Sequence, residues 1–311
     1  MNRHAYLIIA HNQFELLKML IELLDFEQND FYIHIDKKAT DFEFEDFACI
    51  PKKSNIYFTR RICNTWGGFS GIETELILLK EAAKKDYSYF HLISGVDLPL
   101  KKPEEIYRFF EQNSGREFVH FSTEEFCQKQ STVERISLYH LFHEKAGRSD
   151  NFYSKLEKIS LALQRRLMVD RLKKQGIKPY CGSNWFSITH DLADYLLSKE
   201  KLIKKVFSKS SCADELFLQT LLMESDFKDR LYLPSSQSDP LANMRYIDWT
   251  RGNPYVFKTE DFEGKHCRLC GAANVYLDEW IDDATGEKVY ECSDTGFCKG
   301  RREKQAWKHQ S

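Results

Sequence analysis

The chain has 311 residues, of which 42% are hydrophobic and 30% are charged, and its formal net charge at pH 7 is −2. These values indicate a globular protein with a sizeable core, built as one large domain plus a small appendage, and the evenly spread Lys and Arg residues argue against nucleic acid as a partner. No apolar run approaches the roughly 20 residues that cross a bilayer, so no transmembrane segment is expected, while peripheral membrane association stays open.

The first part of the chain alternates between strand and helix patterns. Met1 to His4 lead directly into the apolar run Ala5 to Ala10 without a signal-peptide core, which predicts a strand and a soluble cytoplasmic protein. Apolar residues then recur at helical spacing from Leu16 to Leu24, and Phe31 to Ile35 form a second strand.

The same alternation returns further along. We expect a strand at Ile56 to Phe58, a helix from Ile72 to Ala83, a strand at Tyr89 to Ile93 and a helix beginning at Pro103. Such alternation predicts an α/β fold, in which a mostly parallel sheet is flanked by helices and ligands bind at the C-terminal ends of the strands. The residues that fall at these ends are His11, Asp36, Trp66, Gly67, Gly68 and Asp97.

The pattern changes between Ser122 and Gly182, where a polar, aromatic-dotted connection precedes a basic helix expected from about Lys155 to Gln175. This segment is interpreted as an insertion that shapes an acceptor site, and its basic residues as a solvated face. The sequence assigns no role to four of its polar residues, namely Glu134, Arg135, Tyr139 and His140.

Five of the nine cysteines are scattered without framework spacing. We expect them to be small apolar residues with unreactive thiols in a reducing compartment. They are Cys49, Cys63, Cys127, Cys181 and Cys212.

Two segments carry residues suited to a transfer reaction. Asp214 and Glu215 open an apolar helix, and about 35 residues later Arg251 stands in a loop that contains Gly252 and Pro254. A carboxylate and a guanidinium in this arrangement suit a general base and an anion clamp for a phosphorylated leaving group. The simpler alternatives are a helix-capping pair of acids and a surface ion pair.

The composition shifts near Phe262, which divides the chain into an expected domain at residues 1–262 and a tail at residues 263–311. The tail contains a C-x2-C pair and a C-x5-C pair, separated by 21 residues in which a hairpin is expected, and the four cysteines are Cys267, Cys270, Cys292 and Cys298. Four thiolates in two turns predict a structural zinc site that would stabilise a tail with too few apolar residues for its own core. An iron–sulfur cluster and free thiols are the alternatives.

Seven short segments, taken in order, resemble glycosyltransferase family 14, which contains the core-2/I-branching N-acetylglucosaminyltransferases and the peptide O-xylosyltransferases. The segments are Tyr6 to His11, Tyr32 to Lys38, Asn64 to Gly68, Leu92 to Leu100, Gly182 to Phe186, Ala213 to Glu215 and Tyr246 to Gly252. The resemblance covers roughly residues 5–262 and implies a GT-A-type nucleotide-sugar fold with inverting, metal-independent transfer from a UDP-sugar. The absence of an Asp-x-Asp triplet from the sequence agrees with this implication.

The resemblance also implies roles for individual residues. Glu215 matches the catalytic base, and Arg251, with Lys258 as a weaker match, corresponds to the diphosphate contact. The other matched positions are His11, Asp36, Trp66 and Gly67 for donor binding, and Asp97 and Trp185 for the sugar and acceptor cleft. The second basic diphosphate contact of the branching enzymes has no counterpart here.

The tail resembles the cysteine segment of the catalytic subunit of carbon–phosphorus lyase, where the cysteines hold an iron–sulfur cluster. The likeness covers only about 40 residues, so radical phosphonate chemistry is not implied.

The sequence therefore predicts an inverting, metal-independent glycosyltransferase that moves N-acetylglucosamine or xylose from a UDP donor to a hydroxyl of a glycan or peptide. One alternative is a catalytically weak nucleotide-sugar or glycan-binding protein with a zinc-ribbon docking tail. A metal-dependent transferase of another family is disfavoured by the missing Asp-x-Asp triplet.

Overall fold

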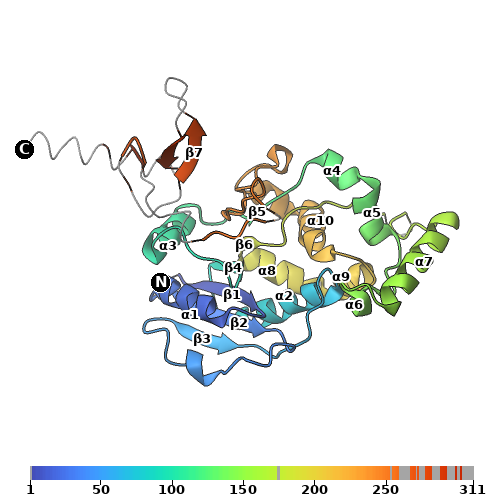
Figure 1. The fold of residues 1–311 in the computed structure, drawn as a ribbon, viewed down its shortest axis with the longest axis horizontal. Helices are drawn as coiled ribbons and strands as arrows, with labels where there is room; N and C mark the ends of the chain where they lie inside the picture. Colours follow the sequence, from blue (N-terminus) through green and yellow to red (C-terminus); the bar gives the residue numbers. More distant parts are fainter. Residues whose placement is uncertain are drawn as a thin grey trace, which may run out of the picture. The chain divides into compact units, whose positions relative to one another are not determined.

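The computed structural model describes residues 2–173, 176–252, 254–258, 267–270, 272, 277–281, 288–292, 298–299 and 302. It divides into two compact units, Met1–Tyr246 and Ile247–Ser311 (Figure 1). This division falls before residue 262, where the composition of the sequence changes.

The first unit is built on a six-stranded mixed sheet with the strand order β3-β2-β1-β4-β6-β5. The strands are β1 (His4–Ala10), β2 (Asn29–Ile35), β3 (Asn55–Phe58), β4 (Tyr89–Ser94), β5 (Phe118–Val119) and β6 (Phe186–Thr189). The first four are parallel, whereas β6 runs antiparallel to β4 and to β5. The predicted α/β fold with a mostly parallel sheet is therefore confirmed.

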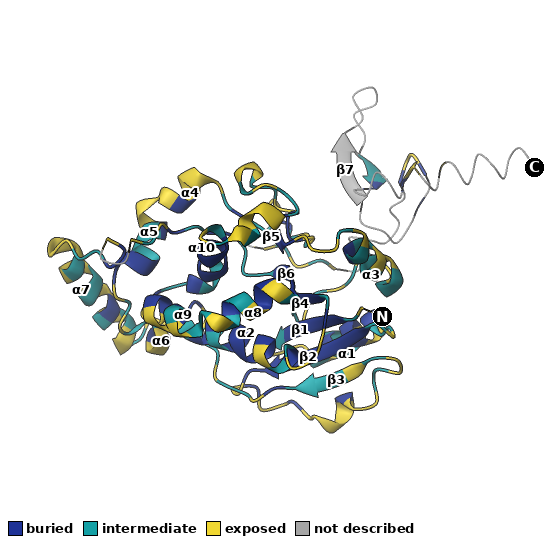
Figure 2. Ribbon diagram, turned by 180° about the vertical axis from the view of Figure 1, so that it is seen from behind, coloured by how far each residue is buried: buried dark blue, intermediate teal, exposed yellow. Residues whose placement is uncertain are grey.

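Helices cover both faces of this sheet. Successive side chains of each strand point to opposite faces, so each strand packs against helices on both sides. On one face, Leu7 and Phe90 pack with α2 (Phe69–Ala82), α8 (His190–Ser198), α9 (Glu200–Phe207) and α10 (Phe217–Met223). On the other face, Ile8 and Phe31 pack with α1 (Phe14–Leu24), while α3 (Pro103–Gln112) packs on Tyr89 and Phe118. The central strands are consequently buried on both sides (Figure 2).

Helices form the insertion between β5 and β6. They are α4 (Glu124–Gln128), α5 (Gln130–Ser137), α6 (His143–Ala146) and α7 (Phe152–Arg166), and four 3₁₀ turns occur elsewhere in the described residues, at Glu45–Phe47, Ala213–Glu215, Asp226–Arg230 and Ser235–Gln237. The predicted helix from Lys155 to Gln175 is wrong at its C-terminal end. Helix α7 stops at Arg166, and Met168 adopts a positive φ of 52°, which a continuing helix does not permit.

In the second unit, β7 (Leu277–Ile281) and β8 (Lys288–Cys292) form an antiparallel pair. Both strands of the predicted tail hairpin are thus confirmed, while its turn at residues 282–287 lies outside the described residues. Within the described part of the chain, no helix combines the length and the apolar character that a membrane span requires.

Candidate active site

Strands β1 and β2 present two of the predicted residues at their C-terminal ends. The backbone N–H of Asp36 donates to the carbonyl of Ala10 at 2.9 Å, so Asp36 lies beside the end of β1, where His11 is exposed. The Asp36 carboxylate is buried and accepts a hydrogen bond from the backbone of Lys38 at 2.9 Å. The two candidate donor-binding residues are therefore neighbours.

The C-terminal end of β4 lies beside the C-terminal end of β1. Gly95 N–H donates to the carbonyl of Ile9 at 2.9 Å, and a Cβ on Gly95 would approach the Cβ of Ala10 to 2.6 Å, so only glycine fits here. This close approach places the turn containing Asp97 next to the end of β1.

Arg245 joins the two residues assigned to the sugar cleft. Its guanidinium pairs with the Asp97 carboxylate at 2.5 Å and lies 4.0 Å from the centre of the Trp185 ring. Its Nη1 is buried and has no hydrogen-bond acceptor among the described residues. Sequence reasoning assigned no role to Arg245, because nothing in its local spacing distinguishes it from a loop cation.

The Trp66-Gly67 turn contacts the segment that leads to Glu215. Cys212 N–H donates to the Gly67 carbonyl at 2.7 Å, and a Cβ on Gly67 would lie 2.8 Å from Cys212 Sγ. Gly67 also has a φ of 67°, so both its conformation and its surroundings require glycine. Trp66 is exposed and stacks under the guanidinium of Arg148 at 3.8 Å.

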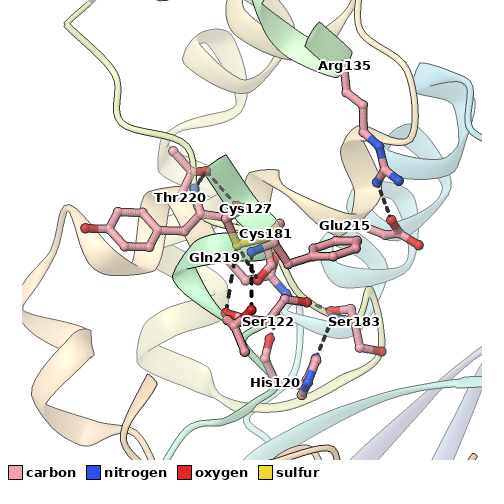
Figure 3. The surroundings of a disulfide bond; sticks show 12 residues. His120, Ser122, Cys127, Arg135, Cys181, Ser183, Glu215, Gln219 and Thr220 are labelled. Carbon is pink, nitrogen blue, oxygen red and sulfur yellow. Dashed lines mark hydrogen bonds and ion pairs between the residues drawn. A yellow bond between two sulfur atoms is a disulfide. The ribbon is translucent and has the colours of Figure 1, made fainter. Parts of the chain in front are cut away.

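Glu215 ends a 3₁₀ turn, Ala213–Glu215, rather than lying in the first turn of the following helix as predicted. Its carbonyl accepts a hydrogen bond from Gly182 N–H at 2.9 Å, which fixes the backbone. Its side chain is 45% exposed, and Oε2 accepts a hydrogen bond from Arg135 Nη1 at 2.6 Å (Figure 3). The carboxylate is thus both accessible and oriented by a cation that the sequence left without a role.

Two further carboxyl groups, those of Glu75 and Asp214, lie in or near the 3₁₀ turn of Glu215. Glu75 in α2 is 1% exposed, and burial, reinforced by Asp214, raises the pKa of Glu75 well above its usual value. Burial, reinforced by the charge of Glu215, raises the pKa of Asp214 to about 6. Glu75 Oε2 and Asp214 Oδ1 have no hydrogen-bond partner among the described residues. Asp214 is therefore a half-buried neighbour of the candidate base, with a buried Oδ1, rather than an exposed helix cap.

Cys127 and Cys181 form a disulfide, so the prediction that both are unreactive thiols is wrong (Figure 3). They are 54 residues apart in sequence, which is why their spacing gave no signal. Gly182, next to Cys181, holds the backbone of Glu215, and a Cβ at Gly182 would lie 1.9 Å from the His120 carbonyl. A disulfide favours an oxidising compartment, and it therefore removes one argument for the predicted cytoplasmic location.

The predicted residues of the first unit accordingly lie along one connected edge. Lys37 N–H donates to the Ile62 carbonyl at 2.9 Å, which ties the Asp36 turn to the segment that connects β3 to Trp66. The edge continues through Gly67 and Cys212 to Glu215, and then through Gly182 to Trp185 and Asp97.

Arg251 and Lys258 belong to the second unit. Arg251 Nε pairs with Asp248 at 2.5 Å, and its guanidinium lies 4.1 Å from the centre of the Tyr255 ring. Burial acts to raise the pKa of Asp248, but hydrogen bonds from Arg251 and Thr250 outweigh it and lower this pKa to about 2. The loop therefore holds Arg251 in a defined orientation, while Lys258 is exposed.

The four tail cysteines come together as a candidate metal centre. Their sulfur atoms lie within 4.8 Å of one another, with Cys267 Sγ 3.7 Å from Cys298 Sγ and Cys270 Sγ 3.5 Å from Cys292 Sγ. Tetrahedral zinc with bonds of about 2.3 Å would separate its sulfur ligands by about 3.8 Å. The Cys292 N–H also donates to Cys267 Sγ at 3.3 Å, as expected for a thiolate.

The family model of the core-2/I-branching enzyme matches residues 4–268. The chain belongs to this family. A second model, that of phosphonate metabolism protein PhnJ, matches residues 240–304, so the likeness of the tail is confirmed as well. Both findings agree with the resemblances seen in the sequence, and the α/β fold is the one expected for the branching enzymes.

Curated relatives are xylosyltransferases. Xylosyltransferase sqv-6 of Caenorhabditis briggsae is 24% identical over 78% of this chain, and xylosyltransferase 2 of Rattus norvegicus is 24% identical over 84% of it. The chain spans about 30% of the length of each relative. Among solved structures, apo mouse xyloside xylosyltransferase 1 has 9% identity and a TM-score of 0.33, with 73% of this chain and 83% of that one covered, which is too distant to add weight.

Proposed function

We propose that the chain is an inverting, metal-independent glycosyltransferase that transfers xylose or N-acetylglucosamine from a UDP-sugar to a hydroxyl of a glycan or peptide. The observation that carries this proposal is the Glu215 carboxylate, which is accessible at the strand-end edge and oriented by Arg135 at 2.6 Å. Family membership and the xylosyltransferase relatives support the choice of reaction and of sugar.

In the proposed reaction, Glu215 accepts the proton of the acceptor hydroxyl as its oxygen attacks the anomeric carbon. The bond from that carbon to the diphosphate oxygen breaks on the opposite face, and UDP leaves with the electron pair. Stabilisation of the departing charge is assigned to Arg251 and Lys258 by their resemblance to the family's diphosphate contacts alone. His11, Asp36, Trp66 and Gly67 bind the nucleotide, and Asp97, Trp185 and Arg245 bind the sugar.

The experiment is a transfer assay with purified full-length protein, UDP-xylose and UDP-N-acetylglucosamine. Glu215→Gln should lower kcat by about 10²- to 10⁴-fold, the usual contribution of a general base, and leave the Kd for UDP within two-fold. Glu200→Gln is the matched control, because Glu200 is also paired with a cation, Lys80 at 2.7 Å, but stands at the start of α9. Equal turnover in the two variants would contradict the assignment of the base.

The same assay tests the remaining parts of the proposal. The product should have the anomeric configuration opposite to that of the donor, and added Mn²⁺ or Mg²⁺ should not raise the rate. A UDP-sugar that raises the Tm without any release of UDP would instead indicate the nucleotide-sugar-binding alternative.

A further inference from the structure

A second cluster of metal-ligating side chains lies in the insertion, outside the residues proposed for transfer. His140 follows α5, His143 begins α6, and Glu157 is the one residue of α7 that is buried. Their ligand atoms all lie within 4.8 Å of one another, and His140 Nδ1 is 2.9 Å from Glu157 Oε1.

The hydrogen bonds around this cluster indicate which of its nitrogen and oxygen atoms carry a proton. His140 Nε2 lies 3.0 Å from the carbonyl oxygen of Glu134, which can only accept, so Nε2 carries a proton and Nδ1 of the neutral ring has a lone pair. Glu157 Oε2 accepts from the backbone of Phe142 at 2.8 Å, whereas its buried Oε1 receives no hydrogen bond from a described residue. If the ring is neutral, two acceptors face each other, and this repulsion is relieved either by a second proton on His140 or by a metal ion between the two atoms.

The third group is oriented in the same way. His143 Nε2 lies 3.4 Å from Ser211 Oγ, and the Ser211 N–H donates to the carbonyl of Arg135 at 2.9 Å. Metal-ligating imidazoles commonly have such a second hydrogen bond, which fixes the tautomer and the ring plane. Each of the three side chains thus has a partner that holds it in place outside the cluster.

We propose that His140, His143 and Glu157 bind a zinc ion. Two imidazoles and one carboxylate are a familiar zinc ligand set, and bonds of about 2.0–2.1 Å would separate tetrahedral ligands by about 3.3 Å. The observed contact of 2.9 Å needs to widen by only a few tenths of an ångström. The fourth position would be filled by water.

The position of the cluster gives the ion a role at the proposed active site, and this role rests on the proposed function. The Glu134 carbonyl held by His140 precedes Arg135, whose side chain orients Glu215. His143 Nε2 contacts Ser211, whose N–H donates to the carbonyl of Arg135 itself at 2.9 Å. The zinc ion would therefore act as a positioning element that fixes Arg135, without touching the substrate.

The test is the zinc content of purified full-length protein in a Cys270→Ser background, which removes the contribution of the tail. This protein should contain about one zinc per chain after dialysis against equimolar zinc. Adding Glu157→Gln or His143→Asn should abolish the binding, and His190→Asn should not, although His190 also faces a carboxylate, Asp194 at 3.6 Å. Absence of zinc from the Cys270→Ser protein would overturn the proposal.

A thermal-shift measurement separates the zinc site from an ion pair between doubly protonated His140 and Glu157. If zinc binds, it raises the Tm of the parent protein and leaves that of Glu157→Gln unchanged. An ion pair instead predicts that zinc has no effect on the parent and that Glu157→Gln lowers the Tm equally with and without zinc, which would also overturn the proposal. Neither readout depends on transfer, and Glu215→Gln should retain its zinc, so this inference and the proposed function fail separately.

Discussion

Arg135 is the side chain that most directly affects the candidate base. The guanidinium is 27% exposed and bonds Glu215 Oε2 at 2.6 Å, so it holds the carboxylate in one of its rotamers. A hydrogen bond between charged groups contributes about 1.5–3 kcal/mol. Without it, the base would sample orientations from which it cannot reach the acceptor hydroxyl.

We therefore expect Arg135→Ala to lower kcat by about 10- to 100-fold with little change in the KM for the donor, because the donor contacts lie elsewhere. Arg135→Lys should restore part of the loss. Steady-state kinetics of UDP release measures the effect, and Arg230→Ala is the control, since Arg230 pairs with Asp191 at 2.8 Å on the surface. An unchanged kcat in Arg135→Ala would show that the ion pair does not position the base.

Glu75 is a second residue whose ionisation should have a measurable effect, in this case on the pH dependence of stability. Its pKa is raised by burial and by Asp214, so the folded protein binds its proton more tightly than the unfolded chain does. Stability then falls as the pH rises above the ordinary carboxyl pKa of about 4 and through the raised values of this residue and of Asp214, which titrates at about 6.

Glu75→Gln keeps the volume of the side chain and removes one buried ionisable group. At pH 5 the variant should be about as stable as the parent protein, and at pH 8 it should be more stable. Urea unfolding at the two pH values measures this difference. Glu73→Gln, on the same helix but with an exposed side chain, should show no such pH dependence, and an equal effect of Glu75→Gln at both pH values would contradict the prediction.

At the scale of the elements, the sequence predicted what local periodicity determines. The strands from Ala5, Phe31, Ile56 and Tyr89 and the helix at Pro103 are confirmed, because each carries its own apolar pattern. The C-terminal end of α7 was missed, since residues compatible with a helix, such as Leu167 and Met168, continue past Arg166 and nothing in the sequence signals the positive φ of Met168.

The contacts between elements were harder to predict from the sequence than the elements themselves. The segments that carry Asp36, Gly67 and Asp97 could be placed along one edge, because strand ends converge in a parallel sheet, whereas nothing in the sequence pattern placed Glu215 there. The roles of Arg135 and Arg245 could not be predicted, since they depend on side chains reaching across the fold to Glu215 and Asp97. The pairing of Cys127 with Cys181 was hidden for the same reason.

The disulfide connects α4 to the segment that holds the backbone of Glu215. We expect Cys127→Ala/Cys181→Ala to lower the free energy of unfolding by about 2–4 kcal/mol, because the unfolded chain regains the freedom of the open loop. Denaturant unfolding with and without a reducing agent measures this loss.

The reducing agent should destabilise the parent protein and leave the double variant unchanged. Cys49→Ala/Cys63→Ala, which removes two exposed free thiols, is the control and should behave like the parent. Equal stability of the disulfide variant and the parent would show that the bond does not stabilise the native state.

At the scale of the whole molecule, the two units have different sources of stability. The first has a continuous apolar core on both faces of its sheet. In the second, the buried cluster found among the described residues consists of four cysteines and Ala272. These five described residues alone bury too little apolar surface to stabilise the β7–β8 hairpin, and structural zinc supplies about 10–16 kcal/mol to comparable small folds.

We therefore expect the tail to lose its structure without metal while the large sheet persists. In hydrogen exchange, the amides of β7 and β8 should be protected in the parent protein and should exchange fast after chelation or in Cys267→Ser, whereas those of β1 should stay protected. Cys212→Ser keeps the tail ligands and should leave the protection of β7 and β8 intact. Protection of the hairpin that survives removal of the metal would mean that the cysteines stabilise the tail in some other way, and an equal loss in β1 would mean that the two units do not fold independently.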